Sequence, residues 1–159
     1  LHISGNNGSD DLFMFLKKKV TGLKPNTTYE LLFNVRIASN VPTGAVGIGG
    51  APGESVYVKV GSTLLEPNKE LQAGMYRMNI DKGNQAEEGG DMINIGNVGV
   101  SANTIEYTVI TRNNNSSNSF VITTDASGEI WLVIGTDSGF EGTTSLYYTQ
   151  VDVFFNGTD

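Results

Sequence analysis

Residues 135–144, with the sequence GTDSGFEGTT, place two carboxylates four positions apart in a glycine-rich segment. Asp137 and Glu141 supply carboxylate oxygens, and the glycines between them permit sharp turns and left-handed backbone. Calcium takes about six to eight oxygen ligands, including backbone carbonyls. Residues 6–11, NNGSDD, form a second oxygen-rich segment, in which Asn7 and Asp11 are the candidate ligands. Both segments could therefore hold a calcium ion.

Two other chemistries compete for these segments. Glycoside hydrolysis uses an acid and a nucleophile or base at a set separation. Further carboxylates for such a pair are Asp81, Glu87, Glu88 and Asp91. However, a chain with 17 acidic residues forms many accidental pairs, and Asp and Ser also cap turns through nearby backbone N–H groups. We therefore expect turns that need no cofactor, with a structural calcium ion as the alternative and catalysis as the third interpretation.

The remaining catalytic classes lack their residues. The chain has no cysteine, which excludes disulfides and thiolate chemistry. A Ser-His-Asp hydrolase needs an oriented histidine, but His2 is the only histidine and no G-x-S-x-G sequence is present. We expect that the protein is not an enzyme.

Charge and hydropathy restrict the partners and the compartment. The formal net charge is −7, and the longest basic run is the three lysines of residues 17–19, so nucleic-acid binding is not expected. No apolar stretch approaches the roughly 20 residues that span a membrane. A composition rich in Gly, Asn, Ser and Thr favours an extracellular, cell-surface or periplasmic protein.

The elements that position these groups are β-strands, because apolar and polar residues alternate with period two between Gly, Asn, Pro and Ser clusters. The clearest alternation is in residues 28–39, where every second residue from Tyr29 to Ile37 is apolar. One helical turn is predicted near residues 86–94. The predicted strands are residues 11–20, 28–39, 55–60, 75–81, 105–112, 119–124, 129–134 and 145–155.

This pattern predicts an all-β fold, an antiparallel two-sheet β-sandwich of jelly-roll type. No repeat or linker divides the chain, so residues 1–159 are predicted to form a single domain. Because the sequence opens at Leu1 without a methionine, we expect that the most N-terminal segment of the jelly roll is missing. Such a segment could carry an export signal.

Two parts of the chain resemble a known family. VTGLKPNTTYELLFNVRIAS (residues 20–39) and SLYYTQVDVFF (residues 145–155) are similar to segments of β-sandwich carbohydrate-binding modules with the galactose-binding-like jelly roll, and LHISGNN fits the opening of that region. The resemblance covers about a third of the chain. It implies a jelly-roll domain that binds carbohydrate, while the central motifs resemble those of exported bacterial proteins.

The sequence also departs from that family. The resemblance implies a calcium ion bridging the first strand and an Asp-Asp pair of the closing strand, but Thr149 and Gln150 occupy those positions. Three central motifs match no binding module of the family, namely GIGGAPGESVYVKVG, NIDKGNQ and GTDSGFEGTT.

Glycan binding requires an aromatic ring to stack on the sugar and neighbouring donors for its hydroxyls. Several side chains alternate onto the non-core faces of the predicted strands, and Trp131 is the only tryptophan. The alternative for Trp131 is packing under a loop. The predicted glycan-binding residues are Trp131, Tyr148, Arg77, Arg36, Asn79, Tyr57 and Gln150.

The leading functional hypothesis is non-catalytic glycan binding by an exported bacterial protein, and the net charge favours a neutral glycan. The alternative is a structural or adhesion module that binds another protein at the cell envelope. A glycoside hydrolase or lyase comes third. The sequence leaves the sugar and the oligomeric state open.

Overall fold

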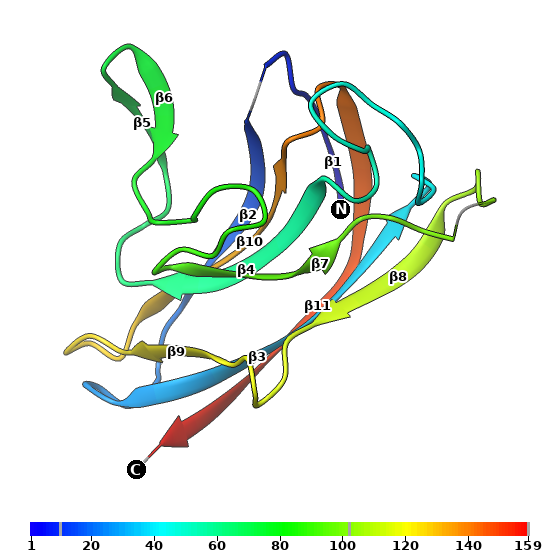
Figure 1. The fold of residues 1–159 in the computed structure, drawn as a ribbon. Helices are drawn as coiled ribbons and strands as arrows, with labels where there is room; N and C mark the ends of the chain where they lie inside the picture. Colours follow the sequence, from blue (N-terminus) through cyan, green and yellow to red (C-terminus); the bar gives the residue numbers. More distant parts are fainter. Residues whose placement is uncertain (10, 102, 159) are drawn as a thin grey trace.

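The described residues form eleven β-strands and no helix (Figure 1). The computed structural model describes residues 1–9, 11–101 and 103–158. Accordingly, the described residues contain no helix that could span a membrane. The strands are β1 (His2–Asn6), β2 (Leu12–Val20), β3 (Thr28–Ser39), β4 (Val56–Thr63), β5 (Lys69–Gln72), β6 (Met75–Met78), β7 (Met92–Asn97), β8 (Thr108–Asn113), β9 (Phe120–Thr123), β10 (Ile130–Ser138) and β11 (Thr143–Thr158).

Two antiparallel sheets pack face to face as a sandwich. The first, sheet A, has the order β1-β11-β3-β8, and β9 pairs with the other end of β3. The second, sheet B, has the order β2-β10-β4-β7. Strands β5 and β6 form a separate hairpin that projects from the sandwich (Figure 1). The predicted all-β antiparallel sandwich is therefore confirmed.

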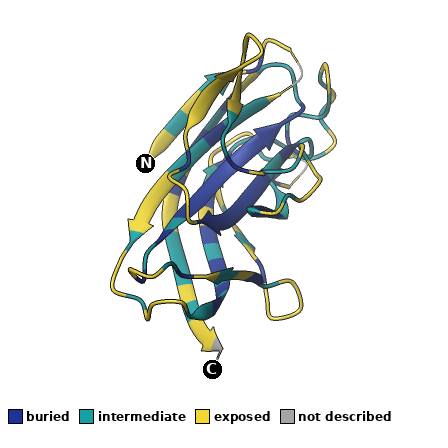
Figure 2. Ribbon diagram, turned by 90° about the vertical axis from the view of Figure 1, so that its left-hand side faces the viewer, coloured by how far each residue is buried: buried dark blue, intermediate teal, exposed yellow. Residues whose placement is uncertain are grey.

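The main core lies between the sheets, where the alternation of β3 and β4 directs apolar side chains inward. Phe33 and Val35 of sheet A, like Val58 and Val60 of sheet B, are at most 1% exposed. Figure 2 shows these buried strands between more exposed loops. The face predicted for residues 28–39 is confirmed.

A second, smaller core lies on the opposite, outer face of sheet B. Ile80 and Met92 pack there on Val133 of β10, with Phe13 and Phe15 of β2 beside them. The segment between β6 and β7 thus covers part of this outer face. Strand alternation alone does not predict this small core, because it lies outside the interface between the two sheets.

Two sequence predictions are wrong in this region. The helical turn expected near residues 86–94 is absent, and Met92–Asn97 instead forms β7, which pairs with β4. The predicted strand 75–81 shortens to β6, whose Tyr76 is 70% exposed because the hairpin stands away from both sheets.

Candidate functional site

The seven predicted glycan-binding residues do not come together. Four locations hold them: the outer face of sheet B, the β5–β6 hairpin and the loop after it, the outer face of sheet A, and the core. Trp131 and Tyr57 lie on the outer face of sheet B, and Arg77 and Asn79 lie on the hairpin and the loop after it. Arg36 and Gln150 lie on the outer face of sheet A, and Tyr148 lies in the core.

Tyr148 was predicted on the polar side of its strand, and this placement is wrong. It is 5% exposed and belongs to the main core, whereas Tyr147 is 39% exposed. The cause is a β-bulge between Tyr148 and Gln150, which shifts the pairing of β11 with β3. The extra residue at a bulge reverses which face of the sheet the residues beyond it occupy. The alternation seen from Phe155 back to Val151 therefore does not predict the faces of the residues before Thr149.

Trp131 is half-buried on the outer face of sheet B, beneath a lysine and a loop. The Lys17 ammonium lies 5.6 Å from the centre of the indole ring. Glu66, Pro67 and Asn68 accept hydrogen bonds from that ammonium at 2.7–2.9 Å. Asn79 in turn binds the backbone of this loop. The lysine over the indole ring is therefore itself held by residues 66–68.

The outer face of sheet A carries an exposed aromatic group next to polar side chains. Tyr147 stacks on His2 with 4.6 Å between ring centres, and Tyr107 contacts it edge-on at 5.0 Å. On the same face, Arg36 lies 3.4 Å from the amide oxygen of Gln150. This face therefore combines exposed rings with hydrogen-bond donors.

The two oxygen-rich segments predicted from the sequence meet at one end of sheet B. Asn7 is buried, and its amide donates to the backbone carbonyls of Ser138 and Phe140 at 3.0 Å each. Asp11 and Asp137 both lie beside the ammonium of Lys82. Positive charge near these carboxylates thus comes from the chain itself.

Asp137 is the centre of a group that we call the lysine–aspartate cluster, composed of Lys59, Lys82 and Asp137, whose side chains are largely or fully buried, and of Asp11, which is exposed. The Asp137 side chain is 0% exposed. Its Oδ2 accepts from the Lys82 ammonium at 2.7 Å and from the Gln85 backbone N–H at 3.0 Å. Its Oδ1 accepts no hydrogen bond from any described group.

Lys59 completes this cluster from β4, and its side chain is also 0% exposed. Its Nζ donates to the backbone carbonyls of Lys82 and of Glu87, the latter at 2.6 Å, and lies 3.5 Å from Asp137 Oδ2. Gly135 faces Lys59 across the β4–β10 pair. A side chain at Gly135 would meet the carbonyl of Met14 and the ring of Phe13, so only glycine fits there.

Burial shifts the pKa values of both Lys59 and Asp137. Desolvation lowers the pKa of Lys59, because the charged ammonium loses its water. Desolvation likewise raises the pKa of Asp137 to about 6, and a hydrogen bond with the Asp11 carboxyl adds to the effect. Two neighbouring carboxyl groups share a proton more readily than they hold two charges. Burial thus increases the neutral fraction of both Lys59 and Asp137.

The segment over this cluster is fixed by its own hydrogen bonds. Asp81 accepts from the backbone N–H groups of Gly83 and Gly90 at 3.1 and 2.8 Å, which lowers the pKa of its carboxyl. Gly83 has φ +71°, and a side chain there would meet the carbonyl of Glu87. This conformation of the loop orients the carbonyls of Lys82 and Glu87 toward Nζ of Lys59.

The three motifs that match no binding module converge at this cluster. Lys59 comes from VYVKVG, Lys82 from NIDKGNQ and Asp137 from GTDSGFEGTT. Sequence reasoning did not single out either lysine. The available signal was Lys59 itself, a charged residue between the valines of a strand whose other face is the core.

The calcium prediction can be tested directly on the purified protein. We expect that excess calcium leaves the melting temperature unchanged and that EDTA does not lower it, because lysine ammoniums already face Asp137 and Asp11. The described residues contain no group of three or more His, Asp or Glu side chains that could hold a metal ion. A ligand bound only by the folded state raises the melting temperature, so a calcium-dependent rise would contradict this expectation.

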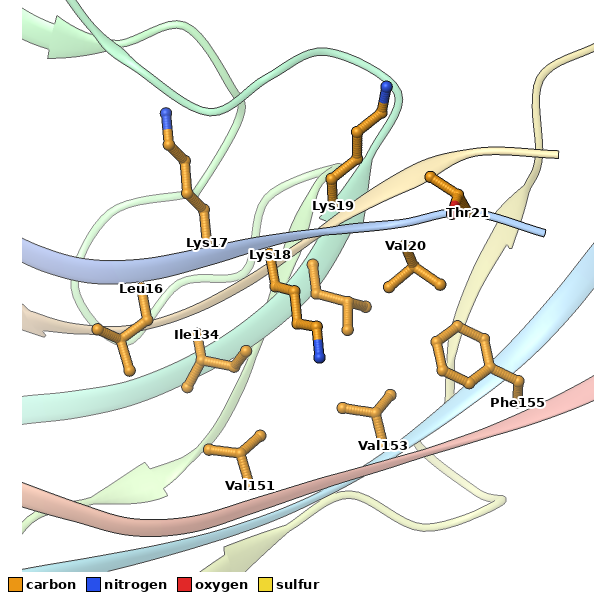
Figure 3. Close-up of a pocket in the computed structure, with 11 residues that line it drawn as sticks. Leu16, Lys17, Lys18, Lys19, Val20, Thr21, Ile134, Val151, Val153 and Phe155 are labelled. Carbon is orange, nitrogen blue, oxygen red and sulfur yellow. The ribbon is translucent and has the colours of Figure 1, made fainter. Parts of the chain in front are cut away.

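A groove of about 560 Å³ opens between the edges of the two sheets (Figure 3). Its walls are mostly apolar and come from β2 and β10 on one side and from β11 on the other. The lining residues are Leu16, Lys17, Lys18, Lys19, Val20, Thr21, Leu132, Ile134, Val151, Val153 and Phe155. Val151, Val153 and Phe155 pack on the core but are only partly buried, because they line this groove.

Lys18 is the charged group in the groove. Its ammonium points between the sheets toward Val153, whereas Lys17 and Lys19 point the opposite way (Figure 3). Lys17 and Lys19 each have a carboxylate partner at 2.7 Å, Glu66 and Glu129. Within the described part of the chain, Lys18 has no ion-pair or hydrogen-bond partner for its ammonium.

Both strands that border the groove have a free edge. β2 is the last strand of sheet B and pairs with β10 alone. In sheet A, β1 pairs with Thr143–Tyr147 of β11, and Leu1 exchanges two backbone hydrogen bonds of 2.8 Å with Tyr148. Among the described residues, no strand continues this pairing beyond Tyr148.

Comparisons with protein-family models, curated proteins and solved structures found no match to this chain.

Proposed function

We propose that this domain is a non-catalytic binding module whose groove accepts an extended segment of a partner protein. This is the structural or adhesion alternative raised by the sequence. The free edge of β11 beside an apolar groove carries the proposal, because an exposed strand edge is a template for adding another strand. An exported location, at the cell surface or in the periplasm, belongs to this proposal.

The groove defines the chemistry of the segment that it would accept. Such a strand would extend the line of β1, antiparallel to β11, and bond to backbone groups after Tyr148. Alternate side chains would enter the groove and contact Val151 and Val153, so they should be apolar. The unpaired ammonium of Lys18 favours a carboxylate at one of these positions.

A peptide-display selection with random decamers tests this proposal. We expect the selected peptides to alternate apolar residues with one acidic residue. Lys18→Glu should weaken their binding about tenfold or more, since a hydrogen bond to a charged group contributes about 1.5–3 kcal/mol. Lys19→Glu is the matched control, because Lys19 points away from the groove. Equal weakening by both variants, or no enriched peptide, would contradict the proposal.

Glycan binding is the second candidate, and the outer face of sheet A favours it. Tyr147 and Tyr107 are 39% and 45% exposed, and Arg36 and Gln150 lie on the same face. A sugar could stack on these rings while the guanidinium and amide donate to its hydroxyls. The predicted partner is a neutral glycan, and this proposal replaces Tyr148 with Tyr147 as the stacking residue.

A glycan-array screen, with and without calcium, tests the second candidate. For any glycan that binds, Tyr147→Ala should weaken the affinity about tenfold, a loss within the range of aromatic contacts at binding surfaces. Tyr76→Ala is the control, because Tyr76 is exposed on the distant hairpin. If both variants bind as the unmodified protein does, this face is not the glycan site. Titration calorimetry at high protein concentration provides the measurement.

A further inference from the structure

The lysine–aspartate cluster contains an amine and a carboxyl group that are sealed from water and held in contact. Lys59 and Asp137 are both 0% exposed, and Lys59 Nζ lies 3.5 Å from Asp137 Oδ2. They stand on adjacent strands, β4 and β10, and lie on the same outer face of sheet B. A 0% exposed lysine in contact with a 0% exposed carboxyl group calls for an explanation.

The hydrogen bonds of Lys59 suit a neutral amine. A neutral amine has two N–H donors and one lone pair. Two backbone carbonyls, those of Lys82 and Glu87, accept from Nζ, and the remaining direction faces Asp137. In the neutral amine the lone pair occupies this third direction, whereas in the ammonium a third N–H faces Asp137 Oδ2 there.

The environment of Asp137 suits a neutral carboxylic acid in a complementary way. Its Oδ2 accepts hydrogen bonds from the Lys82 ammonium and from the Gln85 N–H, as a carbonyl oxygen would. Its Oδ1 has no hydrogen-bond partner among the described residues, so no donor there holds it as a carboxylate oxygen. The carboxyl group is thus polarised at one oxygen only.

We propose that Lys59 and Asp137 are joined in the mature protein by an amide bond between Nζ and Cγ, which cross-links β4 to β10. The Nζ lone pair attacks Cγ, so a C–N bond forms and the bond from Cγ to Oδ1 breaks. Oδ1 leaves as water with its own proton and one proton from Nζ. Oδ2 becomes the amide oxygen, and the step needs no oxidant, reductant or other reactant.

The surrounding groups would promote this step. Negative charge develops on Oδ2 during the attack, and the Lys82 ammonium and Gln85 N–H already donate to that atom. The Asp11 carboxyl shares the Lys82 ammonium with Asp137, and in this proposal it carries the proton from Nζ to the departing oxygen. The directions of the pKa shifts, downward for Lys59 and upward for Asp137, increase the reactive neutral forms.

The apolar packing on this face would also favour the product. Phe13 and Phe15 of β2 lie with Met92 and Val133 in the small core beside the cluster. The Lys82 ammonium lies 5.4 Å from the ring centre of Phe13. A dry environment disfavours two charges and accommodates a neutral amide at lower cost. This inference is independent of the proposed binding function.

Mass spectrometry of the denatured, purified chain tests the cross-link. The expected intact mass is lower than the sequence mass by one water molecule. Proteolysis should yield a branched peptide that joins the segments containing Lys59 and Asp137. Lys59→Met and Asp137→Ala should both restore the full mass expected from their sequences, and Lys19→Met should retain the loss of water.

Two results would overturn the proposal. The first is a full sequence mass that persists after prolonged incubation of the folded protein. The second is a loss of water confined to one linear peptide, as in a cyclic imide of an aspartate, which mild base would reverse. Because the unmodified protein gives the decisive result, a variant that fails to fold does not affect the test.

Discussion

Replacing Lys59 by methionine is expected to lower the free energy of unfolding by about 3–5 kcal/mol, because it leaves buried polar groups without a partner, each at a cost of about 1–3 kcal/mol. The variant keeps most of the side-chain volume but leaves the carbonyls of Lys82 and Glu87 without their donor. It also removes one of the two lysines beside Asp137. Urea denaturation, followed by tryptophan fluorescence of Trp131, measures the effect.

Lys19→Met is the matched control for this prediction. Lys19 lies on the same face of sheet B, but its ammonium is exposed and pairs with Glu129 at the surface. Exposed ion pairs contribute little to stability, so we expect the denaturation midpoint to stay nearly unchanged. A loss for Lys59→Met no larger than that of the control would show that the cluster does not stabilise the fold.

Truncation of Phe33 to alanine is expected to cost a similar amount, about 3–5 kcal/mol, if the cavity cannot collapse. Phe33 is 1% exposed in the middle of β3, and it pairs with Val153 of β11. On its other side, β3 pairs with β8 and β9. Its backbone N–H also donates to the side chain of Asn114. These contacts restrict the shift of β3 that would fill the cavity.

Phe154→Ala provides the comparison, because Phe154 lies on the neighbouring strand and is 58% exposed. Surface substitutions of this kind usually change stability by about 0.5 kcal/mol or less. Chemical denaturation of both variants gives the difference. A loss below about 1 kcal/mol for Phe33→Ala would contradict this prediction, since it would mean that the core collapses into the space left by the ring.

The sequence alone determined the fold class and the orientation of the best strands. Residues 28–39 form β3 with the predicted bounds, and their alternate apolar residues from Tyr29 to Ile37 face the core. The reason is local: in a strand, alternate residues lie on opposite faces, so a strict period of two predicts both the element and its buried side.

Only the tertiary structure decided which groups meet. The bulge after Tyr148 depends on pairing with β3, and it moved Tyr147 rather than Tyr148 to the surface. The lysine–aspartate cluster likewise needs groups from β4, β10 and the loop before β7, which lie far apart in the chain. A buried charge is tolerated only where partners from elsewhere surround it, and no periodic pattern in one segment reports those partners.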